Sequence, residues 1–205
     1  MLVRIAFFIL LAIEIYFSTS HQNSLVKITK PLLMPMLMLM AYQLNIKEKY
    51  LYIALFFSLL GDVFLMFSGE LYFMLGLGAF LLAHVFYILL FKAQFKFNLM
   101  SIFPFVGATL SYFMFIKSGI DPNLLIPVSV YCLVITLMGI FAAGRKTNNS
   151  SYNLALMGSI LFIISDSLIA YNKFYAPLPA SSFWVMSTYG LAQFLIVLGW
   201  SKNQN

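Results

Sequence analysis

Long apolar runs, separated by short polar breaks, fill the whole chain. A helix needs roughly 20 predominantly apolar residues to cross a hydrocarbon core about 30 Å thick, and most of these runs approach that length. The breaks are too short to hold a water-soluble domain, so residues 1–205 are expected to form a single transmembrane helical domain. We predict an all-α integral membrane bundle of eight transmembrane helices: Leu2 to Phe17, Pro31 to Leu44, Tyr50 to Phe67, Leu71 to Phe91, Leu99 to Ile116, Leu124 to Ala143, Tyr152 to Tyr171 and Phe183 to Trp200.

The second expected helix is shorter than the others and contains a proline. At 1.5 Å per residue, the run from Pro31 to Leu44 rises only about 21 Å, which is less than the thickness of the hydrocarbon core. Pro35 also lies near its start and interrupts the backbone hydrogen bonding of the helix there. This helix is therefore expected to be tilted or to extend further at both ends.

Composition and charge support a membrane protein rather than a nucleic-acid-binding one. The chain is 62% hydrophobic and 9% charged, whereas roughly a quarter of the residues of a soluble domain are charged. The net charge is +6, but the basic residues are scattered singly or in pairs and form no basic stripe, so no nucleic-acid partner is expected.

The distribution of the basic residues predicts the orientation in the membrane. Eight helices place both termini on one side, and positive residues accumulate on the cytoplasmic side. We therefore expect both termini in the cytoplasm, and the inner membrane as the location if the protein is bacterial. The side of the termini carries Arg4, Lys47, Lys49, Lys92, Lys96, Arg145, Lys146 and Lys202, whereas the other side carries Lys27, Lys30, Lys117 and Lys173.

Three acidic residues, Glu14, Asp62 and Asp166, fall inside expected membrane spans. A carboxylate at membrane depth costs about 2.5 to 3.5 kcal/mol, so such residues usually face the bundle interior and mark function. Asp62 and Asp166 each precede the expected end of their helix, Phe67 or Tyr171, by about 7.5 Å, which places them at one depth. For Glu14, which has no spaced polar partner, snorkelling or a structural hydrogen bond is expected.

If the helices of Asp62 and Asp166 are neighbours, their carboxyls can share a cavity. Two close carboxyls in a low-dielectric site cannot both ionise easily, so the pair would act as an acid beside a base. The alternatives are a pair of structural hydrogen-bonding residues and the ion ligands of a transporter.

Other polar residues inside the spans are candidates for the same site. His84 lies in the middle of its expected helix, with Tyr87 on the same face, although a lone intramembrane histidine is often a packing residue. Tyr189 and Gln193 form a polar pair one turn apart, which would complete a cavity wall or bond neighbouring helices.

Two lysines are expected at the outer rim, near the carboxyls. Lys173 follows Asp166 by two helical turns on one face, and Lys30 directly precedes the second expected helix. They would hold a phosphate or anchor helix ends at the lipid headgroups. The sequence has no His, Cys and carboxylate cluster with ligand spacing, so we expect neither a metal nor another cofactor.

The two halves of the chain show a faint internal repeat. Leu60-Gly61-Asp62 aligns with Ile164-Ser165-Asp166, and the segment that ends at His84 then lies opposite the segment that ends at Gln193. Two four-helix pseudo-repeats would bring the aspartates together across their interface. The same arrangement is compatible with an ion-coupled transporter.

The polar motifs and their order resemble the YhhN-like family of lysoplasmalogenases, which are small multi-pass membrane proteins. The resemblance covers the second to the eighth expected helix. It rests on Lys30-Pro31-Leu-Leu-Met-Pro35, Gly61-Asp62-Val-Phe-Leu65-Met66, Gly76-Leu-Gly78-Ala-Phe80-Leu-Leu-Ala-His84-Val-Phe-Tyr87, Ser165-Asp166-Ser-Leu-Ile-Ala170-Tyr-Asn172-Lys173-Phe174 and Thr188-Tyr189-Gly-Leu-Ala-Gln193.

The resemblance implies hydrolysis of the 1-alkenyl (vinyl) ether of a lysoplasmalogen to a fatty aldehyde and glycerophosphoethanolamine or glycerophosphocholine. It also implies that Asp62 and Asp166 are the catalytic pair. One would protonate the alkene, and the other would stabilise the resulting cation and orient a water molecule. Lys30 and Lys173 would hold the substrate phosphate. The groups that support the aspartates or position water would be His84, Tyr87, Tyr189 and Gln193.

Three other functions remain open at the level of the sequence. An ion-coupled transporter would use the carboxyl pair as its ion site. An intramembrane aspartyl protease also carries two aspartates on two helices, but Leu59 stands where its Gly-x-Gly-Asp signature has the first glycine. A lipid-binding membrane protein without catalysis would keep its activity after the loss of either carboxyl.

Overall fold

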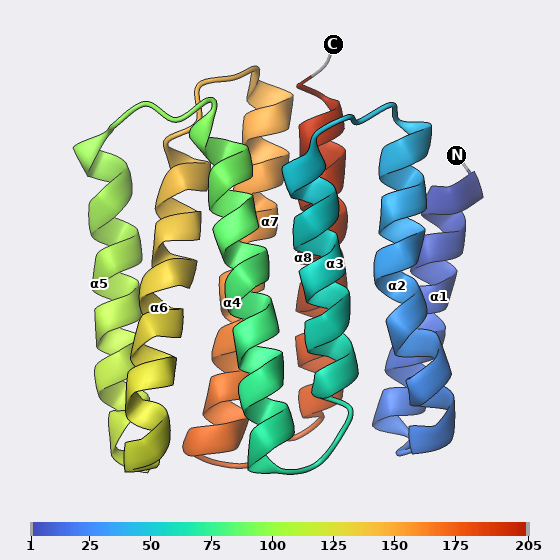
Figure 1. Cartoon of the computed structure of the whole chain (residues 1–205), viewed down its shortest axis with the longest axis vertical. Coiled ribbons are helices and arrows are strands. Elements are labelled where there is room, and N and C mark those ends of the chain that lie inside the picture. The colour runs from blue at the N-terminus through green and yellow to red at the C-terminus, as the bar shows by residue number, and fades with distance from the viewer. Residues whose placement is uncertain (1, 204–205) are drawn as a thin grey trace.

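The computed structural model describes residues 2–203 and consists of α-helices joined by short connections (Figure 1). In the described part of the chain the only β-type pairing is an isolated bridge between Phe95 and Arg145. The helices are α1 (Leu2–Thr19), α2 (Asn23–Gln43), α3 (Lys49–Phe64), α4 (Glu70–Lys92), α5 (Leu99–Ile116), α6 (Pro122–Ala143), α7 (Asn149–Phe174) and α8 (Ser181–Ser201), with a short 3-10 helix η1 (Lys117–Gly119) after α5.

Polar residues at the helix starts explain where several helices begin. The side chains of Asn98, Asp121 and Asn148 each accept a hydrogen bond from a backbone N–H of the first helical turn, in α5, α6 and α7 respectively. Such caps satisfy donors that have no partner within the helix. Pro122 follows Asp121 at the first helical position, where its missing N–H is no loss.

Seven of the helices are long and apolar enough to cross a membrane, and the chain is a multi-pass membrane protein. The exception is α3, whose 16 residues rise about 24 Å. Many large apolar side chains on the outer surface are exposed, as expected for a surface that faces lipid tails. The all-helical class is therefore confirmed, whereas crossing by all eight helices stays a prediction.

Several predicted helix boundaries are wrong. The second helix runs from Asn23 to Gln43 and contains both Pro31 and Pro35, so Lys30 lies inside the helix and not before it. The third helix ends at Phe64 and the seventh at Phe174. Asp62 is thus almost at the end of α3, while Asp166 lies two turns from the end of α7. The prediction that the two aspartates lie at equal distances from their helix ends is therefore wrong.

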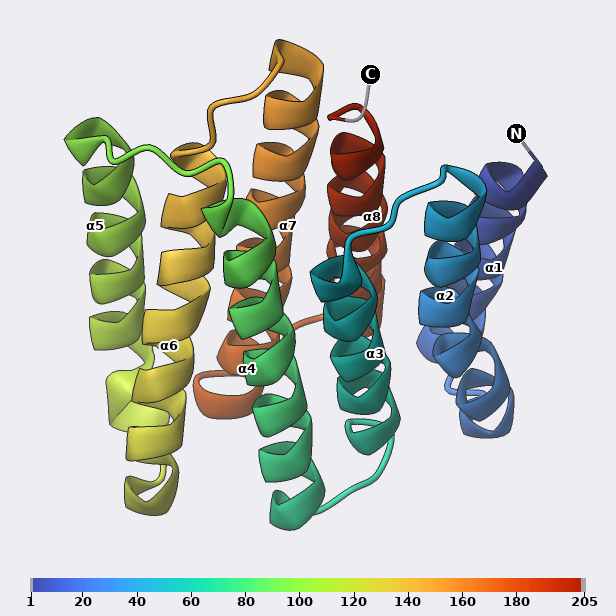
Figure 2. The ribbon, with the colours of Figure 1, turned by 45° about the horizontal axis from the view of Figure 1, so that its top comes forward.

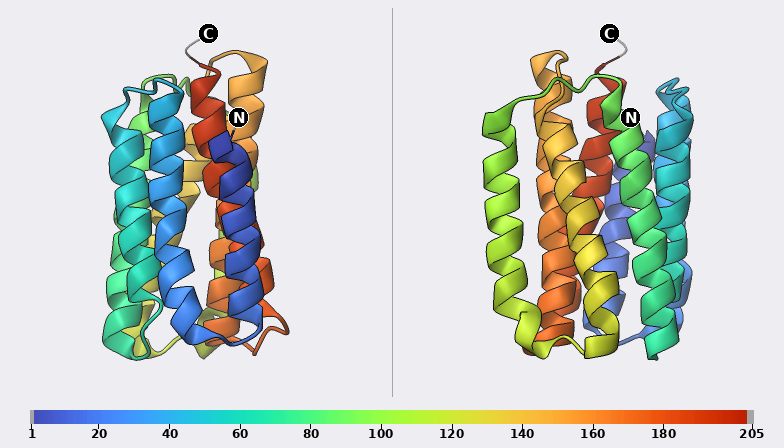
Figure 3. Two further views of the ribbon diagram at one scale, coloured as in Figure 1. Left: turned by 90° about the vertical axis from the view of Figure 1, so that its right-hand side faces the viewer. Right: turned by 60° about the vertical axis from the view of Figure 1, so that its left-hand side comes forward.

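Seven of the helices form a closed ring, and α5 stands outside it. Around the ring, α1 packs on α2, α2 on α3, α3 on α4, α4 on α6, α6 on α7, α7 on α8, and α8 on α1. Helix α5 packs on α6 and touches α7 only slightly, which Figures 2 and 3 show as its position at the margin of the bundle. Because α3 packs mainly on α2 and α4, the two aspartate helices are not direct neighbours.

Chain direction alternates along the bundle, so α1 begins and α8 ends at the same end (Figure 1). The close pairing of α7 with α8 depends on small residues. A Cβ on Gly199 would lie 2.7 Å from the backbone nitrogen of Ala155, and one on Gly158 would lie 2.8 Å from the carbonyl oxygen of Ala192. Small residues at helix crossings let backbones approach in this way, and here they fix the position of Asp166 relative to Tyr189.

Candidate active site

Asp166 lies where three helices meet in the bundle interior. Its Oδ2 accepts a hydrogen bond of 2.5 Å from the hydroxyl of Tyr131 on α6, and Nε2 of His84 on α4 lies 3.6 Å from the same oxygen. The Asp166 side chain is 11% exposed, whereas His84 is completely buried. The imidazole of His84 packs edge-on against the rings of Tyr131 and Phe162. A carboxyl, a phenol and an imidazole thus occupy one small region.

Asp62 occupies a separate part of the interior, between α3 and α8. Its Oδ2 accepts a hydrogen bond of 2.7 Å from the hydroxyl of Tyr189, and its exposed fraction is 2%. Lys30 on α2 interacts electrostatically with this carboxyl and with Glu14 on α1. Asp62 is therefore a buried acid that has one hydrogen-bond donor and one nearby cation.

Aromatic rings connect the two aspartates. The ring of Phe162 lies between the groups, with centroids 4.6 Å from that of His84 and 5.5 Å from that of Tyr189. Phe80 packs edge-on against both Phe162 and Tyr189. A negative charge on Asp62 would be felt at Asp166 across these rings. The carboxyls are thus coupled through a low-dielectric layer in which charge interactions are poorly screened.

Tyr87 and Gln193 form a third polar group in the interior. The hydroxyl of Tyr87 donates to Oε1 of Gln193, and Nε2 of Gln193 donates to the hydroxyl of Ser58 at 2.9 Å. All three side chains are fully buried, and their hydrogen bonds connect α4, α8 and α3. This network holds α3 and α8 in the register that brings Asp62 to Tyr189.

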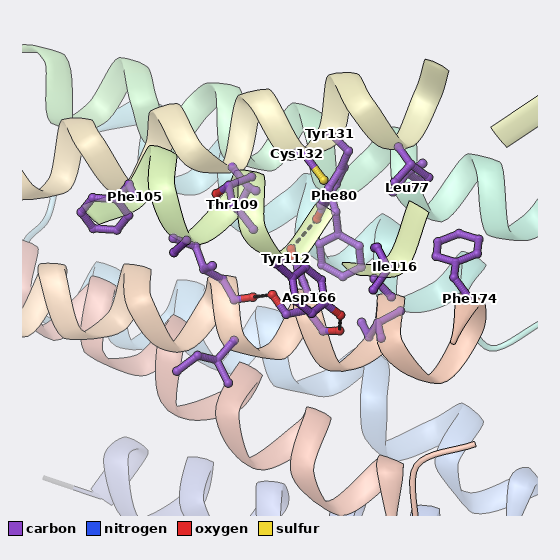
Figure 4. A pocket seen from close by; sticks show the side chains of 18 of the residues that line it. Leu77, Phe80, Phe105, Thr109, Tyr112, Ile116, Tyr131, Cys132, Asp166 and Phe174 are labelled. Carbon is purple, nitrogen blue, oxygen red and sulfur yellow. Dashed lines mark hydrogen bonds between the residues drawn. The ribbon is translucent and has the colours of Figure 1, made fainter. Parts of the chain in front are cut away.

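A cavity of about 530 Å³ lies between α4, α5, α6 and α7 and reaches Asp166 (Figure 4). Among the described residues that line it, Asp166 is the only charged one, and most of the others are aliphatic or aromatic. Asp62 does not line it. Its volume falls within the range of small-molecule sites. The arrangement presents one carboxyl, with Tyr131, to an apolar molecule bound between the helices.

The two predicted phosphate-binding lysines lie in different surroundings. Lys173 is near the end of α7 and exposed, with its ammonium 5.1 Å from the centroid of the Phe73 ring, which lines the cavity. Lys30 is half-buried inside α2, which is not adjacent to α7 in the ring. The expectation that Lys30 directly precedes its helix, at the rim, is therefore wrong.

Glu14 is completely buried, and neither of its carboxyl oxygens has a hydrogen-bond partner among residues 2–203. The expectation that it snorkels or makes a structural hydrogen bond is wrong. The same part of the chain contains no group of three or more His, Cys, Asp and Glu side chains able to hold a metal ion.

Tyr131 and Ser58 are site residues that the sequence did not reveal. The chain has 12 tyrosines, and no motif or spacing distinguishes Tyr131 from the others. Its one sequence signal is that a hydroxyl-bearing side chain stands in the middle of an apolar run. The predicted residues His84, Tyr87, Tyr189 and Gln193 all point into the interior and are buried.

Comparison with known proteins gives related sequences. The profile of the YhhN family matches residues 25–200. A human protein named lysoplasmalogenase TMEM86A is 35% identical over 162 residues, which cover 72% of this chain and 63% of the human protein. A rat protein named lysoplasmalogenase TMEM86B is 31% identical over 150 residues, covering 71% of this chain and 58% of the rat protein. The chain thus spans less than two thirds of the length of these relatives, and no solved structure matches it.

Proposed function

The chain belongs to the YhhN family, and on this premise we propose that it is a lysoplasmalogenase. It hydrolyses the 1-alkenyl ether of a lysoplasmalogen and releases a fatty aldehyde and a glycerophosphoethanolamine or glycerophosphocholine. The observation that carries this proposal is the carboxyl of Asp166, which faces an apolar cavity among membrane helices. The names of the relatives from human and rat support the same reaction.

In this proposal all eight helices cross the bilayer as a single domain, with both termini in the cytoplasm. The alternating chain direction and the excess of basic residues at the end of the bundle with the termini support this orientation. The two four-helix pseudo-repeats are part of the proposal. The close packing of α3 on α4 and of α7 on α8 supports equivalent roles for these helix pairs.

Asp166 is the proposed acid, because a proton donor must reach the alkene and this carboxyl lines the cavity. The contacts with Tyr131 and His84 both involve Oδ2, which leaves Oδ1 to carry the proton. Transfer of this proton to the β-carbon of the vinyl ether converts the C=C–O group into an oxocarbenium ion. The carboxylate that remains lies beside the new cation and stabilises it.

A water molecule then adds to the carbon next to the ether oxygen and returns a proton to Asp166. The hemiacetal that forms collapses to the aldehyde and the glycerol hydroxyl, so that one water is consumed and the acid is regenerated. The carboxylate of Asp166 orients this water, and Tyr131 and His84, which adjoin the carboxylate, hold it in position. No metal takes part in these steps.

Asp62 acts on Asp166 through the aromatic layer and not by contact with the substrate. Its negative charge opposes a second negative charge nearby, so the proton is retained on Asp166 before reaction. The same charge stabilises the oxocarbenium ion. Tyr189 holds Asp62 in place, and Tyr87 and Gln193 maintain the helix register on which that hydrogen bond depends.

The lysines take different parts in this proposal. Lys173, at the end of α7 and about two turns from Asp166, binds the phosphate of the substrate. Lys30 lies inside α2 and offsets the charge of Asp62 and Glu14, a position that does not favour a phosphate contact.

The test measures aldehyde release from a 1-alkenyl lysophospholipid by the purified protein in detergent. Asp166→Asn is expected to abolish activity, and Asp62→Asn to reduce it strongly. Asp121→Asn is the matched control, because Asp121 caps α6 without lining the cavity and asparagine caps equally well. A saturated ether analogue should be inert because it has no alkene carbon to protonate.

Wild-type protein that releases no aldehyde, or an Asp166→Asn variant with full activity, would contradict this mechanism. Proton flux in liposomes without hydrolysis would instead support an ion-coupled transporter.

A further inference from the structure

We propose that Phe105, at one end of the cavity, limits the length of the alkenyl chain that the protein accepts. This inference rests on the proposed function, because it assumes that the cavity holds the apolar chain of a lysoplasmalogen. Phe105 would select among substrates by chain length, although it lies outside the cluster around Asp166.

The cavity is elongated parallel to the helices. Its lining on α5 extends from Pro104 to Ile116, a rise of about 18 Å, and its lining on α7 extends from Ile160 to Phe174, about 21 Å. In Figure 4 Phe105 lies at one end, Phe174 at the opposite end, and Asp166 between them. A chain whose alkene lies at Asp166 therefore has two directions available to it.

The charges assign one direction to the headgroup and the other to the chain. Lys173 lies beyond Asp166 at the end of the cavity that Phe73 and Phe174 line, so the phosphate is directed there. The opposite part, toward Phe105, is lined mostly by aliphatic side chains such as Ala108 and Ile163. The apolar chain consequently extends from Asp166 toward Phe105.

Phe105 is held by close packing against a glycine of α6. A Cβ on Gly139 would lie 2.5 Å from Cδ1 and from Cε1 of the Phe105 ring, and 3.0 Å from Cδ1 of Ile163. The ring thus rests directly on the α6 backbone, where only glycine leaves space for it. A ring fixed in this way presents a wall to the chain, because close-packed interiors resist displacement.

Two neighbouring residues of α5 provide a matched pair of variants. Ala108 lines the cavity one turn from Phe105 on the side of Asp166, so Ala108→Leu fills space that the chain would use. Gly107 faces open space, with no atom within 4 Å of an added Cβ, so Gly107→Leu adds similar apolar volume outside the cavity. Phe105→Ala removes the wall.

The experiment measures kcat/KM for alkenyl lysophospholipids that increase stepwise in chain length. Each methylene group that becomes buried is worth about fourfold in kcat/KM. In Phe105→Ala the preferred chain is expected to be longer, with kcat/KM rising by about this factor for each methylene beyond the wild-type optimum. In Ala108→Leu the preferred chain is expected to be shorter. Gly107→Leu is expected to keep the wild-type dependence on chain length. A profile that is the same in wild type, Phe105→Ala and Ala108→Leu would overturn the proposal.

A binding measurement separates this proposal from the proposed function. Saturated 1-alkyl lysophospholipids of the same lengths cannot be hydrolysed, but a bound ligand raises the unfolding temperature. If the wild type releases no aldehyde, the lysoplasmalogenase proposal fails. The role of Phe105 is then decided by the chain length of the alkyl ligand that raises the unfolding temperature most. A longer optimum in Phe105→Ala supports that role, and an unchanged optimum overturns it.

Discussion

The hydrogen bond between Tyr131 and Asp166 gives the sharpest test of the proposed acid. In Tyr131→Phe the hydroxyl that donates to Oδ2 of Asp166 at 2.5 Å is lost, while the ring that packs edge-on against His84 remains. The substitution therefore removes one polar contact of the carboxyl and leaves the packing nearly unchanged. Any change in activity then reports on the hydrogen bond.

The expected magnitude follows from the kind of bond that is lost. Asp166 is neutral before the reaction and becomes a carboxylate as it gives up its proton, and a hydrogen bond to a charged group contributes about 1.5 to 3 kcal/mol. If the bond holds Asp166 in position through the reaction, its loss raises the barrier by that amount, which corresponds to a decrease of about 10- to 150-fold in kcat/KM. The assay is aldehyde release from a 1-alkenyl lysophospholipid in detergent, with kcat and KM determined separately.

Tyr112→Phe is the matched control for this variant. Tyr112 also lines the cavity, but its hydroxyl donates to the backbone carbonyl of Ser167 and not to Asp166. Its loss should affect stability modestly and kcat/KM by less than about threefold. Equal activity of Tyr131→Phe and wild type, or equal losses in the two variants, would refute the view that Tyr131 acts through Asp166.

Two buried charges outside the cavity lead to predictions about stability, both measured by thermal unfolding in detergent. The guanidinium of Arg145 donates to Gln94 and Ser151 and stacks on aromatic rings, and although burial lowers its pKa to about 10 it stays charged at neutral pH. Arg145→Lys cannot keep this forked geometry and should lower the free energy of unfolding by about 1.5 to 3 kcal/mol, so unchanged stability would contradict the importance of these bonds. Glu14→Met replaces a buried carboxyl that lacks hydrogen-bond partners among residues 2–203, and should raise the free energy of unfolding by about 1 to 3 kcal/mol with activity retained. A loss of activity in Glu14→Met would instead place Glu14, with Lys30, in the function of Asp62.

The number of helices and the alternation of their directions were predictable from the sequence, because both follow from the succession of apolar runs. Helix boundaries were not, and α2 illustrates the reason. Lys27, Lys30 and two prolines interrupt its apolar pattern, yet the helix continues through all of them from Asn23. Within a bundle, neighbouring helices satisfy the backbone groups that proline leaves free, and an individual run does not reveal its neighbours.

Only some residues of the candidate site were predictable, again because a single apolar run does not reveal its neighbours. A carboxyl inside an apolar run is costly, so Asp62 and Asp166 are conspicuous in the sequence. A tyrosine in the same environment is common, and Tyr131 becomes a candidate only when the fold brings α6 to α7. The order of helices around the ring, with α4 next to α6 and α5 excluded, has no counterpart in the hydropathy pattern.

The position of α5 outside the ring means that the closed ring of helices and the cavity share only part of their boundary. Of the α5 residues only Ile116 is buried, so α5 closes one side of the cavity with few buried residues, while the seven ring helices pack on one another without it. The apolar cavity thus lies between the ring and a helix at its margin, so a lipid would enter it sideways from the bilayer without crossing the centre of the ring.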